Sequence, residues 1–465
     1  MLEKNKIEEY LKKCLETGAD FSEIFLETTT KNNIIMNNSK IDKVTTSIIN
    51  GIGIRICQGV KKVYGYTNKL DDENILEIIE KLTQSFEGEI NKNEVELNEL
   101  ESFKDKIKIP HKKYLETDKK KILLKIDEIA RSKSNYVNQV YASLVENHQK
   151  VTIANSEGIY REDDRIFTGL SIDVYVKSDD LKEKSSLRKC FKTGYEFLEN
   201  INLETEIDKL VTSAIAKLYA KECPSGTMPV IIGNGFGGVI FHEACGHSLE
   251  ATTVAKETSV FTNMLETKIA NSKVTLKDNA LIPEMWGSNN IDDEGNLCQN
   301  TTLIENGVLK NYLIDKINNR TMKLNLTSSG RRESYKFSPT SRMSNTYLEK
   351  GNDKIEDMIK SIEYGIYAKE MGGGSVNTIT GEFNFAVTEA YLIEKGKITD
   401  MVKGASLIGS GQEVIKNVSM VGEDLELSPG WCGSISGSIP VTVGVPTIKV
   451  DNILVGGKGE KINEL

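Results

Sequence analysis

Two histidines, His242 and His247, stand five positions apart in a chain of 465 residues that contains four histidines in all. Glu243 directly follows the first of them. The segment is therefore similar to the H-E-x-x-H arrangement of zinc proteases, in which two histidines share one helix face and the glutamate is the general base. The spacing of five is different, because on a regular helix the two rings would diverge by roughly 140°. A regular helix could not offer both imidazoles to one metal ion.

The neighbouring glycines suggest how the two rings could meet. A single widened turn with an i→i+5 hydrogen bond would bring them together, and such turns are frequent at functional sites. Gly246 lowers the cost of this distortion, so we predict a π-type bulge or a helix break at Ala244–His247. The glycine-rich segment Gly233–Gly238 lacks the Gly-Lys-Ser/Thr of a phosphate loop and would let another segment pass close to the helix. The alternative is a buried histidine pair on an ordinary helix.

The chemistry predicted for this pair is zinc-dependent peptide hydrolysis. Neutral His242 and His247 would bind Zn(2+), and a third protein ligand would leave one coordination position for water. Zinc would lower the pKa of that water and polarise a peptide carbonyl, while Glu243 takes the proton and returns it to the leaving amine. His111 and His148 lie among Lys, Asn and Gln, and we expect them on the surface.

The elements that must position these residues differ between the two parts of the chain. About a third of residues 1–223 are charged, against about a fifth of residues 224–465. The second part holds most of the glycines and nearly all of the prolines, a composition typical of strands, turns and close backbone approaches. We therefore predict an α+β fold. An N-terminal α/β domain (1–223) precedes a β-rich, barrel-like or sandwich-like catalytic domain (224–465) that carries the metal-binding helix.

The N-terminal domain is predicted to contain two helix–strand repeats. The first consists of a helix, two extended segments, a hairpin and a second helix, at residues 3–17, 21–28, 32–37, 51–67 and 68–86. The second copy has its helices and strands at residues 118–132, 135–144, 150–155, 167–176, 184–193 and 204–221. Each copy would place amphipathic helices beside a group of strands.

Several short motifs in the second part belong together. The segment from Gly235 to Ala251 reads GFGGVIFHEACGHSLEA. Further motifs are W-G-S at 286–288, D-D-E-G at 292–295, G-R-R-E-S-Y at 330–335, R-M-S-N at 342–345, G-G-G at 372–374 and W-C-G at 431–433. This combination resembles the TldD/PmbA family of bacterial and archaeal metalloproteases, specifically the TldD branch that keeps the metal site. The resemblance extends over most of the chain.

The resemblance implies a complete ligand set. It implies that His242, His247 and Cys432 hold the zinc and that Glu243 is the general base. A thiolate ligand is chemically reasonable, because zinc binding lowers the pKa of a cysteine thiol. The chain departs from the family after this cysteine, where Ser434-Ile435-Ser436 replaces the usual Lys and Gly-Gln.

The remaining cysteines have other expected roles. The seven cysteines form an odd set without paired spacing, and no signal sequence is visible. This pattern indicates reduced thiols of a cytoplasmic protein. Cys245 is expected to pack in the core, and Cys298 is the one other candidate ligand.

Charged and glycine residues in the motifs are candidate substrate-binding residues. They are Asp292, Asp293, Arg331, Arg332, Arg342, Gly373 and Gly374. The acidic run Asp292, Asp293 and Glu294 could form a solvated loop, hold a substrate amine or contact a ligand histidine. The arginines could pair with that acidic run or with a peptide carboxylate. The glycines could form a turn or mark a place where substrate backbone approaches closely.

The resemblance also implies substrates and partners. It implies a cytoplasmic peptidase that cleaves small or unfolded peptides held in extended form, and main-chain hydrogen bonds would carry that affinity. It implies a heterodimer with a metal-free TldE/PmbA-type subunit, or a homodimer. The alternative is a non-catalytic peptide-binding or scaffold subunit of such a complex. A net charge of −9 offers no basic footprint for nucleic acid, and no apolar stretch reaches the roughly 18 residues of a membrane helix.

Overall fold

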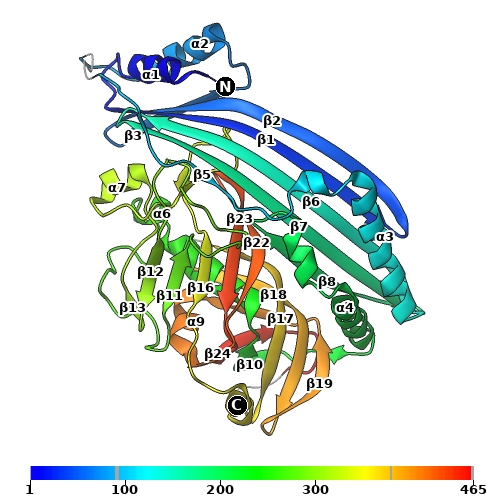
Figure 1. Cartoon of the computed structure of the whole chain (residues 1–465). Helices are drawn as coiled ribbons and strands as arrows, with labels where there is room; N and C mark the ends of the chain where they lie inside the picture. The colour runs from blue at the N-terminus through cyan, green and yellow to red at the C-terminus, as the bar shows by residue number, and fades with distance from the viewer. Residues whose placement is uncertain (1, 90–93, 378–379, 462–465) are drawn as a thin grey trace.

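Four strands of 17 to 20 residues dominate the N-terminal sheet of this computed structural model, which describes residues 2–89, 94–377 and 380–461. They are β1 (Phe21–Asn37), β2 (Lys40–Gln58), β6 (Val137–Asn155) and β7 (Ile159–Ser178). The sheet order is β3-β2-β1-β6-β7, these strands are antiparallel, and β8 also pairs with β7. In Figure 1 this sheet curves over one side of the C-terminal part.

The order helix, three strands, helix occurs twice in this region. The first copy is α1 (Lys4–Lys13), β1, β2, β3 (Lys61–Thr67) and α2 (Asp72–Thr83). The second copy is α3 (Glu116–Lys133), β6, β7, β8 (Leu181–Phe191) and α4 (Leu203–Leu218). The two copies meet where β1 pairs with β6. Two short strands, β4 (Asn98–Glu99) and β5 (Phe103–Lys104), lie in the connection between them and pair parallel with β7.

The strand breaks predicted after residues 28 and 144 are wrong. β1 continues through the polar run Thr28–Asn32, and β6 continues through Glu146–Lys150. The two polar runs pair with each other, from Thr28 opposite Lys150 to Asn32 opposite Glu146. Each run therefore supplies the hydrogen-bonding partners of the other, and neither strand needs an apolar side chain to continue there.

The C-terminal part contains a closed barrel. Its strands, in pairing order, are β17 (Tyr364–Val376), β10 (Gly226–Ile232), β24 (Ile448–Gly456), β20 (Ser406–Ser410) and β18 (Glu382–Glu394). β18 pairs again with β17, which closes the circuit. The strands β9 (Lys221–Glu222), β19 (Lys397–Lys403) and β21 (Val418–Val421) extend this sheet. The prediction of a β-rich, barrel-like second part in an α+β fold is confirmed.

A second sheet in the C-terminal part has at one edge the hairpin that contains Cys432. Its order is β13 (Val308–Leu309), β12 (Asn300–Glu305), β11 (Leu276–Asn279), β16 (Asn345–Leu348), β23 (Gly437–Val445) and β22 (Glu426–Ser434). A separate small ladder joins β14 (Gly330–Arg331) and β15 (Thr340–Ser341). β22 is thus an edge strand, and within the described residues it pairs with β23 alone.

Short helices and turns complete the chain. They are η1 (His111–Lys113), η2 (Tyr195–Asn200), η3 (Gly235–Gly238), α6 (Ala251–Val254), α7 (Lys316–Met322), α8 (Ile355–Lys360) and α9 (Gly411–Asn417). No helix in the described part of the chain is long and apolar enough to cross a membrane. All seven cysteines are free.

Candidate metal centre

The helix that carries both histidines is irregular. It begins as α5 (Val239–Phe241), continues as a π-helical turn, η4 (His242–Gly246), and ends as a 3-10 turn, η5 (His247–Leu249). The predicted π-type distortion is confirmed, although it begins two residues before Ala244. Because of the widened turn, the ring centroids of His242 and His247 lie 5.1 Å apart.

Close packing explains the glycines around this helix. A β-carbon on Gly233 would lie 2.2 Å from the carbonyl oxygen of Lys369 in β17, and one on Gly238 would lie 2.5 Å from the backbone nitrogen of Gly444 in β23. A β-carbon on Gly246 would lie 2.0 Å from Sδ of Met343. The glycine-rich segment therefore does let neighbouring strands pass close to the helix, as we predicted.

His242, His247 and Cys432 form one buried cluster. Their possible ligand atoms all lie within 4.8 Å of one another, and the described part of the chain contains no other such group of His, Cys, Asp or Glu. Sγ of Cys432 is 3.3 Å from Nε2 of His247. The three residues are 2%, 7% and 3% exposed. Cys432 lies on β22, opposite Ile439 of β23. The β22–β23 hairpin thus supplies the thiol, and the helix supplies the two imidazoles.

The two histidines change the acidity of the thiol. Burial raises the pKa of Cys432, but His242 and His247 together lower it to about 3. Burial lowers the pKa of His247, whereas Glu250 and Cys432 raise it well above its ordinary value. The thiolate is therefore the favoured form of Cys432, and the thiolate is the form that binds metal ions.

This donor set fits a zinc ion. Zinc is bound in proteins by imidazole nitrogen and thiolate sulfur, the donor types that this cluster offers close together. Nδ1 of His242 is buried and makes no hydrogen bond within the described residues, so this nitrogen is available as a donor atom. Three protein ligands would leave a coordination position open, as in catalytic zinc sites.

Two carboxylates flank the cluster on different sides. Oε2 of Glu243 lies 3.6 Å from Nε2 of His247, and the Glu243 side chain is 24% exposed, so solvent can reach it. Oε1 of Glu250 lies 3.2 Å from Nδ1 of the same ring, and this side chain is 6% exposed. We did not predict Glu250 from the sequence. Its position three residues after His247, within one helical turn, is the signal that could have identified it.

The acidic run is buried, so its interpretation as a solvated loop is wrong. Asp292, Asp293 and Glu294 are 1%, 4% and 0% exposed. Asp293 lies 2.7 Å from Arg165 of β7, and Glu294 lies 2.6 Å from Arg55 of β2. Buried carboxylates require such charged partners. Asp292 accepts hydrogen bonds from the backbone nitrogens of Glu294 and Asn296 instead. The acidic run thus joins the C-terminal part to the N-terminal sheet.

The three candidate arginines are buried as well. Arg331 donates to the carbonyl oxygens of Met343 and Pro440. Arg332 pairs with Glu23 of β1 and donates to the backbone carbonyl of Asp293, so its guanidinium contacts the acidic run through a backbone oxygen rather than through a carboxylate.

Arg342 is 0% exposed and donates to the carbonyl oxygen of Cys432. It therefore contacts the backbone of a candidate ligand. Gly373 and Gly374 lie in β17, not in a turn, where the pairing with β18 shifts register. Both glycines are exposed. A direct contact of the seven candidate residues with substrate stays a prediction.

The remaining sequence expectations have mixed outcomes. Cys245 is 0% exposed and lies in the apolar core, as expected. Cys298 is buried beside Asp292, and burial together with this carboxylate raises its pKa. It is not part of the histidine cluster.

The two histidines outside the cluster were predicted to lie on the surface. His148 is partly exposed and pairs with Asp164. His111 is also partly exposed, although its Nε2 lies 2.8 Å from Oγ1 of Thr168 and burial lowers its pKa.

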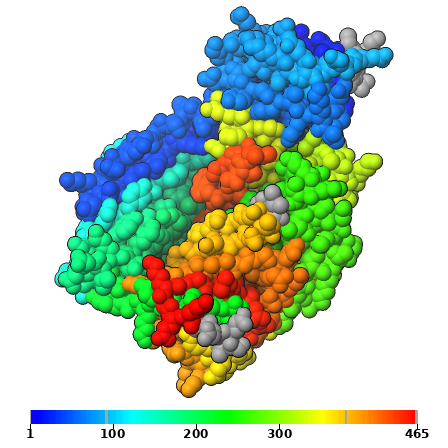
Figure 2. Space-filling view, turned by 180° about the vertical axis from the view of Figure 1, so that it is seen from behind, coloured from blue at the N-terminus to red at the C-terminus, as the bar shows by residue number. Residues whose placement is uncertain are grey.

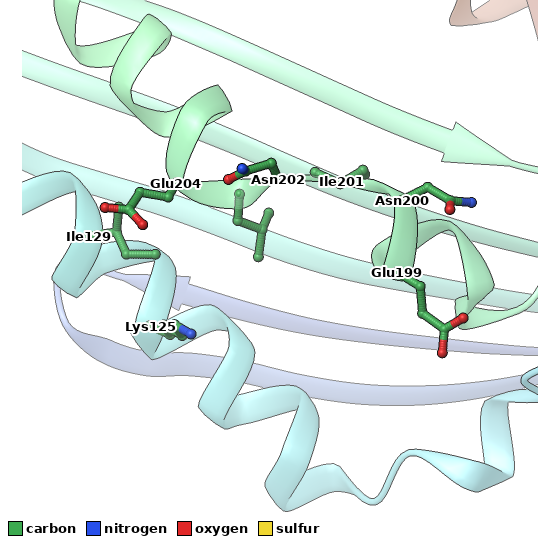
Figure 3. A pocket seen from close by; sticks show the side chains of 8 residues that line it. Lys125, Ile129, Glu199, Asn200, Ile201, Asn202 and Glu204 are labelled. Carbon is green, nitrogen blue, oxygen red and sulfur yellow. The ribbon is translucent and has the colours of Figure 1, made fainter.

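A cavity elsewhere on the molecule contains none of these residues. It has a volume of about 530 Å³ and is formed by α3 and by the connection from η2 to α4 (Figure 3). Its lining residues are Lys125, Ile129, Glu199, Asn200, Ile201, Asn202, Leu203 and Glu204. The candidate metal centre is therefore separate from this cavity.

Comparison with known proteins gives matches along nearly the whole chain. Models of PmbA/TldA metallopeptidase domain 1, the central domain and the C-terminal domain match residues 22–85, 110–220 and 225–457. The chain is 36% identical to a metalloprotease TldD homolog of Buchnera aphidicola subsp. Schizaphis graminum, over 96% of this chain and 95% of that protein. It is 24% identical to a zinc metalloprotease TldD homolog of Saccharolobus solfataricus, over 96% and 99%. The crystal structure of TldE from Thermococcus kodakarensis has the same fold, with a TM-score of 0.74, 19% identity and coverage of 97% and 99%.

Proposed function

Since this chain belongs to the PmbA/TldD family of metallopeptidases, we propose that it is a zinc-dependent peptidase that cleaves small or unfolded peptides. The observation that carries this proposal is the buried cluster of His242, His247 and Cys432 beside the accessible carboxylate of Glu243. The alternative of a non-catalytic scaffold subunit is not favoured, because the chain retains all three donors and the glutamate.

Each residue of the site has a role in this proposal. The two imidazoles and the thiolate hold the zinc, which when bound polarises a peptide carbonyl and lowers the pKa of a water molecule. The carboxylate of Glu243 accepts a proton from the attacking water and delivers it to the nitrogen of the leaving amine. One water is consumed, the peptide C–N bond breaks, and a carboxylic acid and an amine are released.

We propose that the peptide lies along β22 as an added strand. The outer edge of β22 is unpaired in the described part of the chain, and this edge runs past Cys432. An extended peptide on a strand edge binds through main-chain hydrogen bonds and is therefore recognised with little regard to its sequence. The orange tip of the β22–β23 hairpin lies at the surface next to the N-terminal sheet (Figure 2), so a peptide can reach this strand from outside.

We further propose a dimer. The fold shared with TldE of Thermococcus kodakarensis supports a related, metal-free subunit as the partner, and a second copy of this chain is the alternative. Co-purification of this chain with a TldE-type subunit, compared with the oligomeric state of this chain alone, distinguishes the two.

Zinc content and peptide cleavage, measured on one preparation, test the proposal. We expect one zinc per chain and cleavage of an unfolded polypeptide, measured with and without a TldE-type subunit. Glu243→Gln should retain the zinc and lose about 10²- to 10⁴-fold in rate, the usual contribution of a general base. The absence of stoichiometric zinc would contradict the metal assignment. Full activity of Glu243→Gln would contradict the role of the glutamate.

A further inference from the structure

We propose that Glu250 and Arg342 are positioning residues that hold His247 and Cys432 in place from behind the metal centre. The proposal rests on the proposed zinc site and concerns side chains that do not face the substrate. Both residues are buried, at 4% and 0% exposed. Their contacts join the metal-binding helix to the β22–β23 hairpin, the two elements that supply the three ligands.

Glu250 acts on His247. Its Oε1 lies 3.2 Å from Nδ1 of the imidazole, while Nε2 on the opposite side of the ring faces Sγ of Cys432 at 3.3 Å. A carboxylate at Nδ1 favours the tautomer that carries its proton there, which leaves the Nε2 lone pair free for a metal ion. The carboxylate also fixes the rotation of the ring.

Arg342 holds the β22–β23 hairpin, which carries Cys432. Its Nη2 donates to the carbonyl oxygen of Cys432, and its Nη1 donates to Oγ of Ser436 at 2.8 Å and to the carbonyl oxygen of Gly437 at 3.0 Å. The planar guanidinium thus contacts both strands of the hairpin and its turn. Because the guanidinium is buried and rigid, it fixes where the backbone of Cys432 lies relative to the helix.

The two positioning residues also face each other. Nε of Arg342 lies 3.9 Å from Oε1 of Glu250. Both atoms are buried, and Nε of Arg342 makes no hydrogen bond within the described residues. A buried charge is costly unless an opposite charge is near, so each group is the electrostatic partner of the other. The contacts then form a closed ring: His247, Glu250, Arg342, Cys432 and back to His247.

The residues on either side of Arg342, Ser341 and Met343, also pack against the region of the metal-binding helix. Oγ of Ser341 accepts a hydrogen bond from the backbone nitrogen of Thr252 at 2.9 Å, just after the metal-binding helix. On the other side, Met343 packs against Gly246 of that helix. Three consecutive residues, Ser341 to Met343, therefore contact α6, the β22–β23 hairpin and the metal-binding helix. The segment sets the separation between the two ligand-bearing elements.

Zinc affinity and the spectrum of the cobalt form, measured on the full chain, test this proposal. Glu250→Gln and Arg342→Lys should each weaken Zn(2+) binding by about 10- to 100-fold, the usual effect of losing a group that orients a metal ligand. With Co(2+) in place of zinc, each variant should change the visible absorption bands, because these report ligand geometry. A purely structural role would lower thermal stability and leave the spectrum unchanged.

Matched controls separate the possible outcomes. Arg331→Lys removes a buried guanidinium that donates, within the described residues, to the carbonyl oxygens of Met343 and Pro440, and Glu243→Gln removes a carboxylate on the other side of the His247 ring. Both should bind zinc with wild-type affinity. If Arg342→Lys does not fold, the zinc affinity and the cobalt spectrum of Glu250→Gln test the proposal. Wild-type affinity and spectrum in the folded variants would overturn this inference alone, whereas a wild-type chain that binds neither metal would overturn the proposed zinc site as well.

Discussion

Sγ of Cys432 lies 3.3 Å from Nε2 of His247, although the two residues are 185 positions apart in the chain. No other cysteine reaches this point. Cys245 lies on the same helical segment but is 0% exposed and packs in the core, and Cys298 lies among the buried charges beside Asp292. The fold thus places one thiol of seven beside the two histidines.

We predict that Cys432→Ser loses zinc, while Cys245→Ser and Cys298→Ser keep it. A serine hydroxyl is a poor zinc ligand at neutral pH, since zinc sites use thiolate, imidazole and carboxylate donors. Metal analysis of the three purified variants, each dialysed in the same buffer, gives the measurement. A zinc-free Cys245→Ser or Cys298→Ser protein would instead indicate a closed, structural site with a fourth ligand.

We predict that Gly246→Ala destabilises the protein because of Met343. The added β-carbon would lie 2.0 Å from the methionine sulfur, and overpacking of this kind costs about 1–3 kcal/mol. The double variant Gly246→Ala/Met343→Ala should be less destabilised than the sum of its single variants, since the shorter side chain removes the clash. Denaturant unfolding of the four proteins measures the coupling. Additive effects would show that the strain lies in the π turn itself.

The π turn shows what could be predicted from the sequence at the metal centre. A regular helix cannot bring two histidines five positions apart to one metal ion, and Gly246 lowers the cost of a widened turn or a break, so a local distortion follows from short-range rules. The position of Cys432 beside these histidines does not follow from such rules. Nothing near Cys432 distinguishes it from the other cysteines, and only the resemblance to a known family pointed to it. A contact across 185 positions is a property of the fold.

Burial of the acidic run and the length of the N-terminal strands could not be predicted, for a related reason. Asp293 and Glu294 have the composition of a solvated loop, and their partners Arg165 and Arg55 lie in distant strands of the other part of the chain. Likewise, the polar middle of β1 is stabilised by the polar middle of β6. In both cases charged or polar residues that would be costly to bury alone are compensated by partners from a distant segment. Neither segment alone therefore predicts the burial or the strand.

We predict that Arg55→Met strongly destabilises the contact between the two parts. Arg55 is 1% exposed and lies 2.5 Å from Glu23 and 2.6 Å from Glu294, so its loss leaves buried Glu294 without its arginine, while Glu23 keeps its pair with Arg332. Breaking a buried pair in this way costs about 3–5 kcal/mol. Lys81→Met, which breaks the exposed pair with Glu77, is the control and should leave the unfolding midpoint close to that of wild type, because exposed ion pairs contribute little to stability. Equal shifts in unfolding midpoint for the two variants would contradict this assignment.

We predict that Asp315 makes the protein less stable as the pH rises through the weakly acidic range. Burial and the nearby Glu294 raise the pKa of Asp315 to about 6, although hydrogen bonding from Asn318 and the charges of Arg55 and Lys62 oppose this. The folded protein therefore holds this proton more firmly than the unfolded chain. Stability from this group is complete below the unfolded pKa and falls, by up to about 3 kcal/mol, until the pH exceeds the folded pKa. Asp315→Asn has no proton to lose, so denaturant unfolding from about pH 4 to about pH 7 should show its advantage over wild type growing with pH. Parallel stability curves for the two proteins would show that Asp315 titrates normally.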